Sequence, residues 1–202
     1  MPNPIKLLLF DIGGVFIKLS GVHQMLEWTK GLHTEEDLWQ LWLNSPSVKS
    51  FETGQISPHT FAQEFIKEFS LPVSTDTFIQ TFVTWTTLPY TGGRKLMERL
   101  NGHFTTASLS NTNILHWTNL CKTQDIESLF HHNFPSHRMR IMKPDPTIFE
   151  VVLDRLETTP EETLFFDDTQ ANIDAALSLG IGAHQVCGVS ELQEKLMELY
   201  IL

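Results

Sequence analysis

The sequence predicts an α/β protein in which a parallel sheet forms the core and a small all-helical domain is inserted after the first strand. Three observations predict it. Short continuous apolar runs recur along the 202 residues, as in strands that are buried on both faces of a sheet. Segments with helical spacing lie between these runs. One long stretch near the N-terminus is rich in aromatic residues and contains no convincing strand.

Four apolar runs are predicted as strands, and three of them stop at a polar residue. They cover residues 5–10, 104–109, 163–166 and 183–186. Asp11 follows the first run, Ser110 the second and Asp167 the third. In open α/β sheets ligands collect at the carboxyl ends of the strands, so these three residues are candidates for a functional site.

Helices are predicted between the strands, at residues 94–100, 146–156 and 171–179. The last of them stops before Gly180, and glycine is common just after the end of a helix. This alternation of strands and helices implies right-handed crossover connections within the sheet.

The aromatic-rich stretch is predicted to form a separate helical cap. We assign residues 19–90 to the cap, and residues 1–18 and 91–202 to the core domain. The two linkers are expected near residues 18–21 and 88–93, because proline and glycine mark the second of them.

Within the cap, three segments carry signals for the start of a helix. Thr34 and Thr75 are candidate N-caps, and Ser57 is followed by proline at the first helical position. The cap also contains four of the five tryptophans and many phenylalanines. Their helical spacing favours core packing over a cofactor-binding surface, since aromatic residues dominate buried cores.

Composition excludes several classes of function. The net charge of −10 argues against broad nucleic-acid binding, which requires a basic surface. No segment approaches the roughly 20 apolar residues of a membrane span, and the apolar start is too short for a signal peptide. Cys121 and Cys187 lack the spacing of a zinc site or a disulfide framework, so a reducing, cytoplasmic location is expected. A small anionic substrate remains compatible with the acidic chain, because local cations can reverse the field inside one cleft.

Asp11 is a candidate nucleophile. A carboxylate at the end of a buried strand can attack phosphorus and form an aspartyl-phosphate. Gly13 and Gly14 follow it and would allow the backbone to approach a phosphate closely. From this segment alone, a simple turn explains the residues equally well.

Three further residues are candidates for binding a phosphate. Ser110 and Asn111 offer a hydroxyl and N–H groups ahead of a helix, although either could merely cap that helix. Lys143 stands before Pro144 at the entrance to another helix, where a fixed ammonium would offset the charge of a nucleophile and a phosphate. An exposed surface lysine is the alternative.

Asp167 and Asp168 are candidate metal ligands. Adjacent carboxylates after a buried strand repel each other unless a cation joins them. Mg²⁺ suits such a pair, because it is held by one or two carboxylates together with phosphate oxygens and water. The alternative is that one of the two aspartates caps the following helix.

Taken in order, these four segments resemble the motifs of the haloacid dehalogenase-like phosphohydrolases over the whole chain. They read Leu-Leu-Leu-Phe-Asp11-Ile-Gly13-Gly-Val, Ser108-Leu-Ser110-Asn111-Thr-Asn113, Met142-Lys143-Pro144-Asp145-Pro and Leu164-Phe-Phe-Asp167-Asp168. The resemblance implies a Rossmann-like core with a small C1-type cap inserted after the first strand. The motifs of the chain look closest to those of the branch that includes α-D-glucose-1-phosphate phosphatase.

The same resemblance implies a role for each candidate residue. Asp11 corresponds to the nucleophile and Lys143 to the lysine of the third motif. Ser110 is similar to the hydroxyl of the second motif. The metal would be held by Asp11, by the backbone carbonyl of Gly13, and by the acids of the fourth motif, Asp167 and Asp168.

Gly13 departs from the pattern of the family. Many members carry Asp-x-Asp, and the second aspartate transfers a proton to and from the leaving group. Glycine keeps the backbone carbonyl but removes this carboxylate, and such assistance is typically worth about 10²–10⁴-fold in rate. The similar branch lacks the same aspartate. We therefore expect good leaving groups to be favoured, as in sugar 1-phosphates and aryl phosphates.

A second departure is the basic segment before Lys143. Its His137, Arg138 and Arg140 could attract anions to the rim of a site, although a solvated basic turn is the favoured interpretation.

The function expected from the sequence is a Mg²⁺-dependent phosphomonoesterase that acts on a small phosphorylated metabolite, with a sugar phosphate as one candidate. The alternative is a catalytically weak or inactive relative with a binding or regulatory role, which Gly13 motivates. Haloacid dehalogenation is a third interpretation, disfavoured by the acidic pair at Asp167 and Asp168. The sequence identifies no protein partner.

Overall fold

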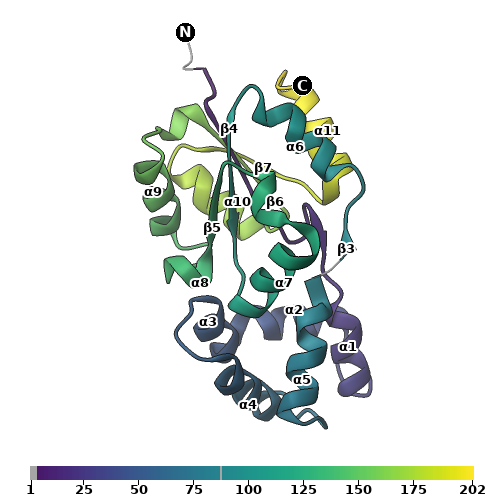
Figure 1. The fold of residues 1–202 in the computed structure, drawn as a ribbon. Helices are drawn as coiled ribbons and strands as arrows, with labels where there is room; N and C mark the ends of the chain where they lie inside the picture. Colours follow the sequence, from purple (N-terminus) through teal and green to yellow (C-terminus); the bar gives the residue numbers. More distant parts are fainter. Residues whose placement is uncertain (1–3, 87) are drawn as a thin grey trace.

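A parallel sheet of five strands forms the core of the part that this computed structural model describes, residues 4–86 and 88–202 (Figure 1). The strands are β1 (Leu7–Phe10), β4 (Thr105–Ser110), β5 (His132–Pro135), β6 (Thr163–Asp167) and β7 (Gly182–Gln185). Their order in the sheet is β5-β4-β1-β6-β7, and every neighbouring pair is parallel. The predicted α/β fold with a parallel sheet is confirmed.

The register of the sheet brings the strand ends together. Phe10 of β1 lies opposite Ser108 of β4 on one side and Phe166 of β6 on the other. Asp11, the next residue, is therefore level with Leu109 and Asp167. This edge of the sheet collects the polar residues that follow the apolar runs.

Successive residues of β1 point to opposite faces of the sheet, as the two-residue period of a strand requires. Leu8 and Phe10 belong to one hydrophobic cluster, and Leu7 and Leu9 belong to another. The first cluster includes buried residues of α6 (Gly93–Asn101), α7 (Ile114–Gln124), η2 (Ile126–Leu129) and α11 (Gly188–Glu198). The second includes buried residues of α9 (Pro146–Arg155) and α10 (Gln170–Ser178). Both faces are covered, which explains the continuous apolar runs.

One strand of the sheet was not predicted. The strand β5 was not predicted, because its His-Asn-Phe-Pro sequence is short and half polar; it lies at an edge of the sheet and pairs only with β4 in the described region. At the proposed linkers near residues 18–21 and 88–93, β2 (Ile17–Lys18) and β3 (Leu88–Pro89) form a short antiparallel pair.

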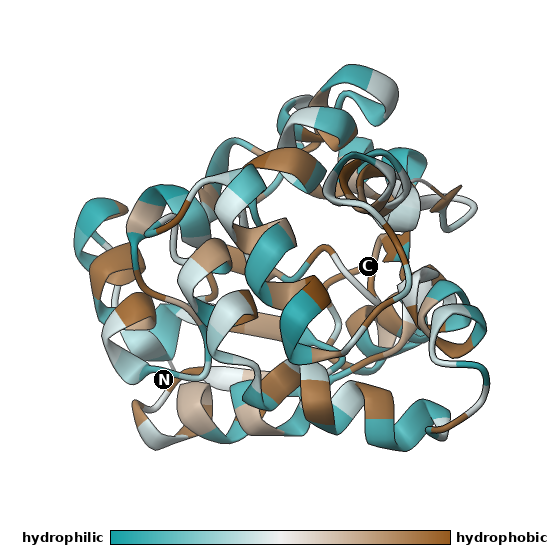
Figure 2. Cartoon of the chain, turned by 90° about the horizontal axis from the view of Figure 1, so that it is seen from below, coloured by the Kyte–Doolittle hydropathy of each residue, from teal (hydrophilic) through white to brown (hydrophobic). Residues whose placement is uncertain are grey.

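The cap consists of helices that pack around a buried aromatic cluster. They are α1 (Gly21–Trp28), α2 (Glu35–Asn44), α3 (Pro46–Glu52), α4 (Pro58–Glu68), α5 (Thr75–Phe82) and η1 (Val83–Thr86). Seen from below, hydrophobic and hydrophilic residues alternate along the helices (Figure 2). Phe61, Phe65 and Phe82 are fully buried, which confirms the predicted core packing for these residues, whereas Trp39 is 38% exposed. We propose residues 19–90 as the cap domain on this basis.

Two of the three predicted helix starts in the cap are confirmed. Thr34 forms a reciprocal capping box with Asp37 at the start of α2. Ser57 accepts a hydrogen bond from the N–H of Thr60 at the start of α4. The third start is displaced by one residue, because Ser74 rather than Thr75 caps α5.

Hydrogen bonds between side chains and backbone fix the cap on the core. His116 Nε2 of α7 lies 2.8 Å from the carbonyl oxygen of Phe82, and Asn119 Nδ2 donates to that of Val83 at 3.1 Å. On the other side, Ser136 of α8 (Ser136–Met139) contacts the carbonyl oxygen of Glu52. Among the described residues, no helix is long and apolar enough to cross a membrane.

Candidate active site

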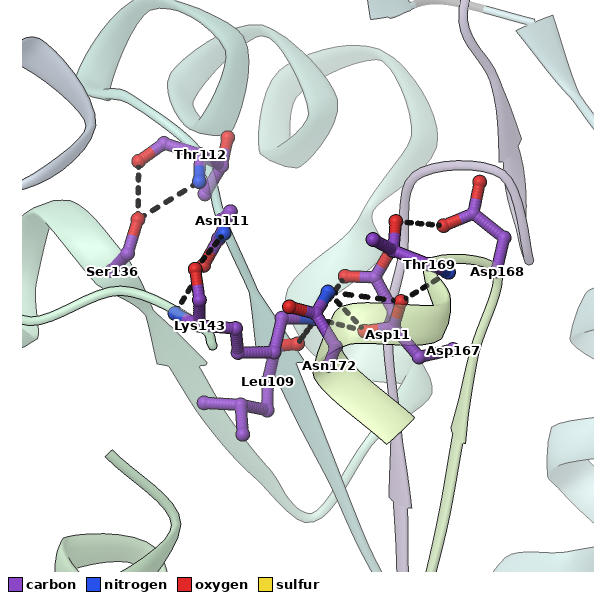
Figure 3. Close-up of polar contacts among 10 residues, drawn as sticks. All are labelled: Asp11, Leu109, Asn111, Thr112, Ser136, Lys143, Asp167, Asp168, Thr169 and Asn172. Carbon is purple, nitrogen blue, oxygen red and sulfur yellow. Dashed lines mark hydrogen bonds and ion pairs between the residues drawn. The ribbon is translucent and has the colours of Figure 1, made fainter. Parts of the chain in front are cut away.

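Lys143 joins two aspartates at the carboxyl edge of the sheet (Figure 3). Its Nζ lies 2.8 Å from Asp11 Oδ1 and 2.6 Å from Asp167 Oδ2, and it donates to the carbonyl oxygen of Leu109 at 2.7 Å. The lysine is only 1% exposed. All three donors of the ammonium therefore have acceptors, and the alternative of an exposed surface lysine is wrong.

The side chain of Asn111 holds the backbone of Lys143 from both sides. Asn111 Nδ2 donates to the carbonyl oxygen of Lys143, and the N–H of Lys143 donates to Asn111 Oδ1, each at 2.8 Å. Helix α7 is capped by Asn113, so capping by Ser110 or Asn111 is also wrong. The amide of Asn111 thus positions the lysine, while Ser110 is buried in the wall of the adjoining cavity.

The two adjacent aspartates have different surroundings. Asp167 is fully buried, and its Oδ1 accepts hydrogen bonds from the N–H of Thr169 at 2.8 Å and from Asn172 Nδ2 at 3.0 Å. Asp168 is half-buried and lines the cavity, with Oδ1 3.1 Å from Thr169 Oγ1. Neither side chain caps α10, whose N-cap is Thr169 without a side-chain bond. Asp167 is therefore held by bonds within the protein, whereas Asp168 lies at the cavity.

Three carboxylates meet here, and each offers an oxygen within 4.8 Å of the others: Asp11, Asp167 and Asp168. Burial raises the pKa of Asp11 to about 7; Lys143 opposes this rise, and Asp167 and Asp168 add to it. Burial also raises the pKa of Asp168, with Asp167 acting in the same direction. Burial alone would lower the pKa of Lys143, but the two aspartates beside it raise that pKa. Three carboxylates against one ammonium leave excess negative charge, and an oxygen-rich cluster of this kind fits a hard divalent cation.

The two glycines after Asp11 have different steric requirements. Gly14 has a φ of +69°, and a Cβ there would lie 1.9 Å from Asp168 Oδ2, so only glycine allows the carboxylate to approach the loop. A Cβ on Gly13 would make only ordinary contacts, 3.4 Å from Leu19 Cδ2 and 3.8 Å from Asp11 Oδ2. The backbone therefore demands glycine at position 14, but it leaves room for a side chain at position 13.

A cavity of about 940 Å³ opens from this polar cluster toward the cap. Asp11, Lys143 and Asp168 lie in its wall on the core side. The cap contributes an apolar wall, formed by Leu38, Trp39, Trp42, Phe65, Phe69 and Trp85. The cavity thus joins a charged end to a wide hydrophobic end.

The basic segment before Lys143 is divided between two environments. Arg138 pairs with Glu127 at 3.0 Å and stacks on the Trp117 ring, so it faces away from the cavity wall. Arg140 lines the cavity. The segment forms the short helix α8 rather than a solvated turn, although Arg138 is exposed, and the anion-attracting alternative is kept for Arg140.

Sequence reasoning missed three residues at this site. Asn172 holds both oxygens of Asp167, and Ser136 bonds the loop after β4 at Thr112. Glu52 of the cap is 7% exposed and lines the same cavity. Ser136 and Glu52 come from segments far apart in the chain, whereas Asn172 lies only five residues after Asp167, and none of the three carries a local signal beyond its polarity.

Comparisons with known proteins agree with this architecture. The chain is 28% identical over 190 residues to sesquiterpene phosphatase astK of Aspergillus oryzae, which covers 91% of each protein. It is 37% identical over 57 residues to a phosphorylated carbohydrates phosphatase of Thermotoga maritima, covering 28% of this chain and 26% of that protein.

A similar solved structure is the HAD family enzyme bt-2542 of Bacteroides thetaiotaomicron, in complex with magnesium and inorganic phosphate. It is 29% identical, with a TM-score of 0.74 over 90% of this chain and 93% of that one. The family model for haloacid dehalogenase-like hydrolases matches residues 5–180. The chain belongs to the haloacid dehalogenase-like hydrolases.

Proposed function

We propose that this hydrolase is a Mg²⁺-dependent phosphomonoesterase that acts through an aspartyl-phosphate. One observation carries the proposal: the buried carboxylate of Asp11 lies 2.8 Å from Lys143 Nζ at the end of β1, beside the acidic cluster. Phosphoryl transfer to an aspartate requires a carboxylate nucleophile, a cation that offsets its charge, and acidic side chains that can bind Mg²⁺.

Each residue then has a defined role. Asp11 attacks phosphorus in line, and the leaving oxygen departs. The Ser110 hydroxyl and the N–H of Asn111 would hold the phosphoryl oxygens, and the positive charge of Lys143 would offset the charge of Asp11 and of the phosphoryl group. Water then hydrolyses the aspartyl-phosphate and regenerates the carboxylate.

The acidic cluster would hold the metal. Asp11, the Gly13 carbonyl and Asp168 would bind Mg²⁺, with Asp167 behind them holding Lys143. The bound cation supplies charge neutralisation for the phosphoryl group. A magnesium and phosphate complex of the similar enzyme bt-2542 supports this assignment.

The cavity favours a phosphate ester with a bulky apolar group. Its volume of about 940 Å³ and its aromatic cap wall offer large hydrophobic contact, and Lys49, Thr53 and Gln55 of the cap also line it. The name of the relative astK, a sesquiterpene phosphatase, supports the same class. A sugar phosphate, one candidate from the sequence, would place many of its hydroxyls against the aromatic part of this wall.

A phosphate-release screen tests the proposal. The panel contains aryl phosphates, isoprenoid monophosphates and sugar phosphates, each with Mg²⁺ and with EDTA. We expect Mg²⁺-dependent release, fastest with apolar esters, and a loss of at least about 10³-fold in Asp11→Asn. Release that survives Asp11→Asn would contradict the nucleophile, and preference for sugar phosphates would contradict the substrate class alone.

A binding or regulatory protein with little turnover is the second candidate, because Gly13 removes the usual proton-transfer carboxylate. It predicts that phosphate and Mg²⁺ bind by calorimetry without release from any ester in the panel. Turnover that depends on Asp11 would exclude it.

A further inference from the structure

Gly13 has no carboxyl group that could transfer a proton, and Glu52 of the cap is a candidate for that role. Glu52 is the last residue of α3 in the cap, yet it is only 7% exposed and lines the same cavity as Asp11, Gly13 and Lys143. It thus places a cap carboxyl in the wall of the cavity that contains the polar site, within reach of the charges of Asp11 and Lys143.

The backbone around Glu52 is fixed to the core. Its carbonyl oxygen lies 2.6 Å from Ser136 Oγ, which also accepts a hydrogen bond from the N–H of Thr112 at 2.9 Å. Gly54 has a φ of +66°, and a Cβ there would lie 2.4 Å from the carbonyl oxygen of His137. The turn after α3 is therefore pressed against the core beside the loop that carries Ser110.

The carboxyl of Glu52 has no structural partner. Among the described residues, none of the ion pairs or side-chain hydrogen bonds involves it. Burial raises its pKa to about 8; Asp11 adds to the rise and Lys143 opposes it. A buried acid that is anchored through its backbone and left unpaired is costly for folding, so a role in the site is the simplest reason to retain it.

We propose that Glu52 is the general acid and base of the reaction and replaces the aspartate that is absent at position 13. This inference rests on the proposed phosphomonoesterase function. It deepens that function by assigning the proton transfer to the cap.

Asp11 forms a bond to phosphorus as the ester P–O bond breaks, and the proton of Glu52 passes to the departing alkoxide, which leaves as an alcohol. Glu52 is then a carboxylate. A water molecule attacks the aspartyl-phosphate, its proton returns to Glu52, and the Asp11 carboxylate and inorganic phosphate are released.

Under this mechanism the wild-type protein accepts poor leaving groups. The restriction to good leaving groups that Gly13 alone predicts becomes a property of variants that lack the Glu52 acid. A loss of kcat/KM that depends on the leaving group also distinguishes proton donation from a purely structural role. Loss of a structural role would lower kcat/KM equally for all substrates.

The test compares p-nitrophenyl, phenyl and benzyl phosphate, whose organic groups are similar in size and whose leaving groups become progressively more basic. In Glu52→Gln we expect kcat/KM to fall about 10²–10³-fold for benzyl phosphate and less than about five-fold for p-nitrophenyl phosphate. Glu52→Asp keeps an acid and should retain part of the benzyl phosphate activity. Glu64→Gln, at an exposed glutamate of α4, is the matched control and should change neither.

A rescue variant makes the test independent of folding losses. Because position 13 has room for a side chain, Gly13→Asp should restore benzyl phosphate turnover in the Glu52→Gln background at least ten-fold. Equal losses on all three esters, or no loss on benzyl phosphate, would overturn the role of Glu52 while leaving the phosphatase intact. Absence of Mg²⁺-dependent release from p-nitrophenyl phosphate by the wild type would instead overturn the proposed function, and this inference with it.

Discussion

The carboxyl edge of the sheet and the interior of the cap are held together by different forces. At the sheet edge, Lys143 and Asp167 are fixed by short, directional contacts, such as the 2.6 Å contact between them. In the cap, aromatic rings pack without charge, as in the stacked pair of Phe51 and Phe61 with centroids 4.3 Å apart. Directional bonds fix the positions of reacting groups, whereas ring packing fixes only volume and shape. We therefore expect chemistry and metal binding to depend on the edge, and stability and substrate shape to depend on the cap.

Removing the cation from the edge should have the largest effect. Lys143→Met leaves the Asp11 and Asp167 carboxylates buried without their partner, so we expect the free energy of unfolding to fall by about 3–5 kcal/mol without Mg²⁺. Phosphate release should fall by at least about 10³-fold. Urea unfolding followed by circular dichroism measures the change in the free energy of unfolding. Lys49→Met, at an exposed lysine of the cavity wall, should change stability by less than about 0.5 kcal/mol. A similar loss in both variants would contradict the special position of Lys143.

Removing a buried side chain from the cap should lower the free energy of unfolding by a similar amount without changing Mg²⁺ binding. Phe61 is 0% exposed, and Phe61→Ala should reduce the free energy of unfolding by about 3–5 kcal/mol. Mg²⁺ affinity, measured by calorimetry on the folded variant, should remain within about two-fold of the wild type, since Phe61 lies in the cap cluster and not at the acidic cluster. A large loss of Mg²⁺ affinity would show that the two regions are not independent.

The contact between the two regions should be sensitive to acid through His116. Burial lowers the pKa of His116 to about 4, and its bond to the Phe82 carbonyl opposes this only in part. In the unfolded chain the pKa returns to about 6.5, so the unfolded state takes up the proton first as the pH falls. The contribution of neutral His116 to the free energy of unfolding is fully present above pH 6.5. It is lost progressively down to about pH 4, by up to about 3 kcal/mol.

Unfolding experiments at several pH values, with His116→Gln as the reference, measure this contribution. The stability difference between wild type and variant should shrink between pH 6.5 and pH 4. A difference that stays constant over this range would contradict a neutral buried histidine.

The smallest effect on the fold should come from Asp168. Asp168→Asn should weaken Mg²⁺ binding by about 10–100-fold, measured by calorimetry, because it removes one carboxylate ligand. Without Mg²⁺ the variant should be at least as stable as the wild type, since one of three neighbouring negative charges is gone. Asp174→Asn, at an exposed aspartate of the following helix α10, is the control. Unchanged Mg²⁺ affinity in Asp168→Asn would place the metal elsewhere.

Much of the edge could be predicted from the sequence because its signals are local. Each of the apolar runs before Asp11, Ser110 and Asp167 forms a buried strand, and parallel pairing necessarily brings their ends together. The cap aromatics at helical spacing were predicted as packing for the same reason. The strand β5 was missed because its neighbour in the sheet, and not its own composition, makes it a strand.

The remainder depends on contacts between distant segments. Nothing near Lys143 in the chain indicates whether it is exposed or buried, and only the meeting of β1, β4 and β6 supplies its three acceptors. The anchoring of the cap carboxyl Glu52 by Ser136, 84 residues away, is equally invisible in the sequence.

The sequence by itself determined the alternation of strands and helices, the aspartate, serine and lysine at the strand and helix ends, and the loss of a carboxylate at Gly13. These follow from periodicity and from short-range backbone preferences, which act within a few residues. The tertiary structure alone decided that Gly14 must remain glycine, that Asn111 positions Lys143, and that the cap places the carboxyl of Glu52 in the wall of the same cavity as Asp11. Close approach, burial and electrostatic coupling are properties of atoms brought together from distant parts of the chain, so they arise only when the fold is complete.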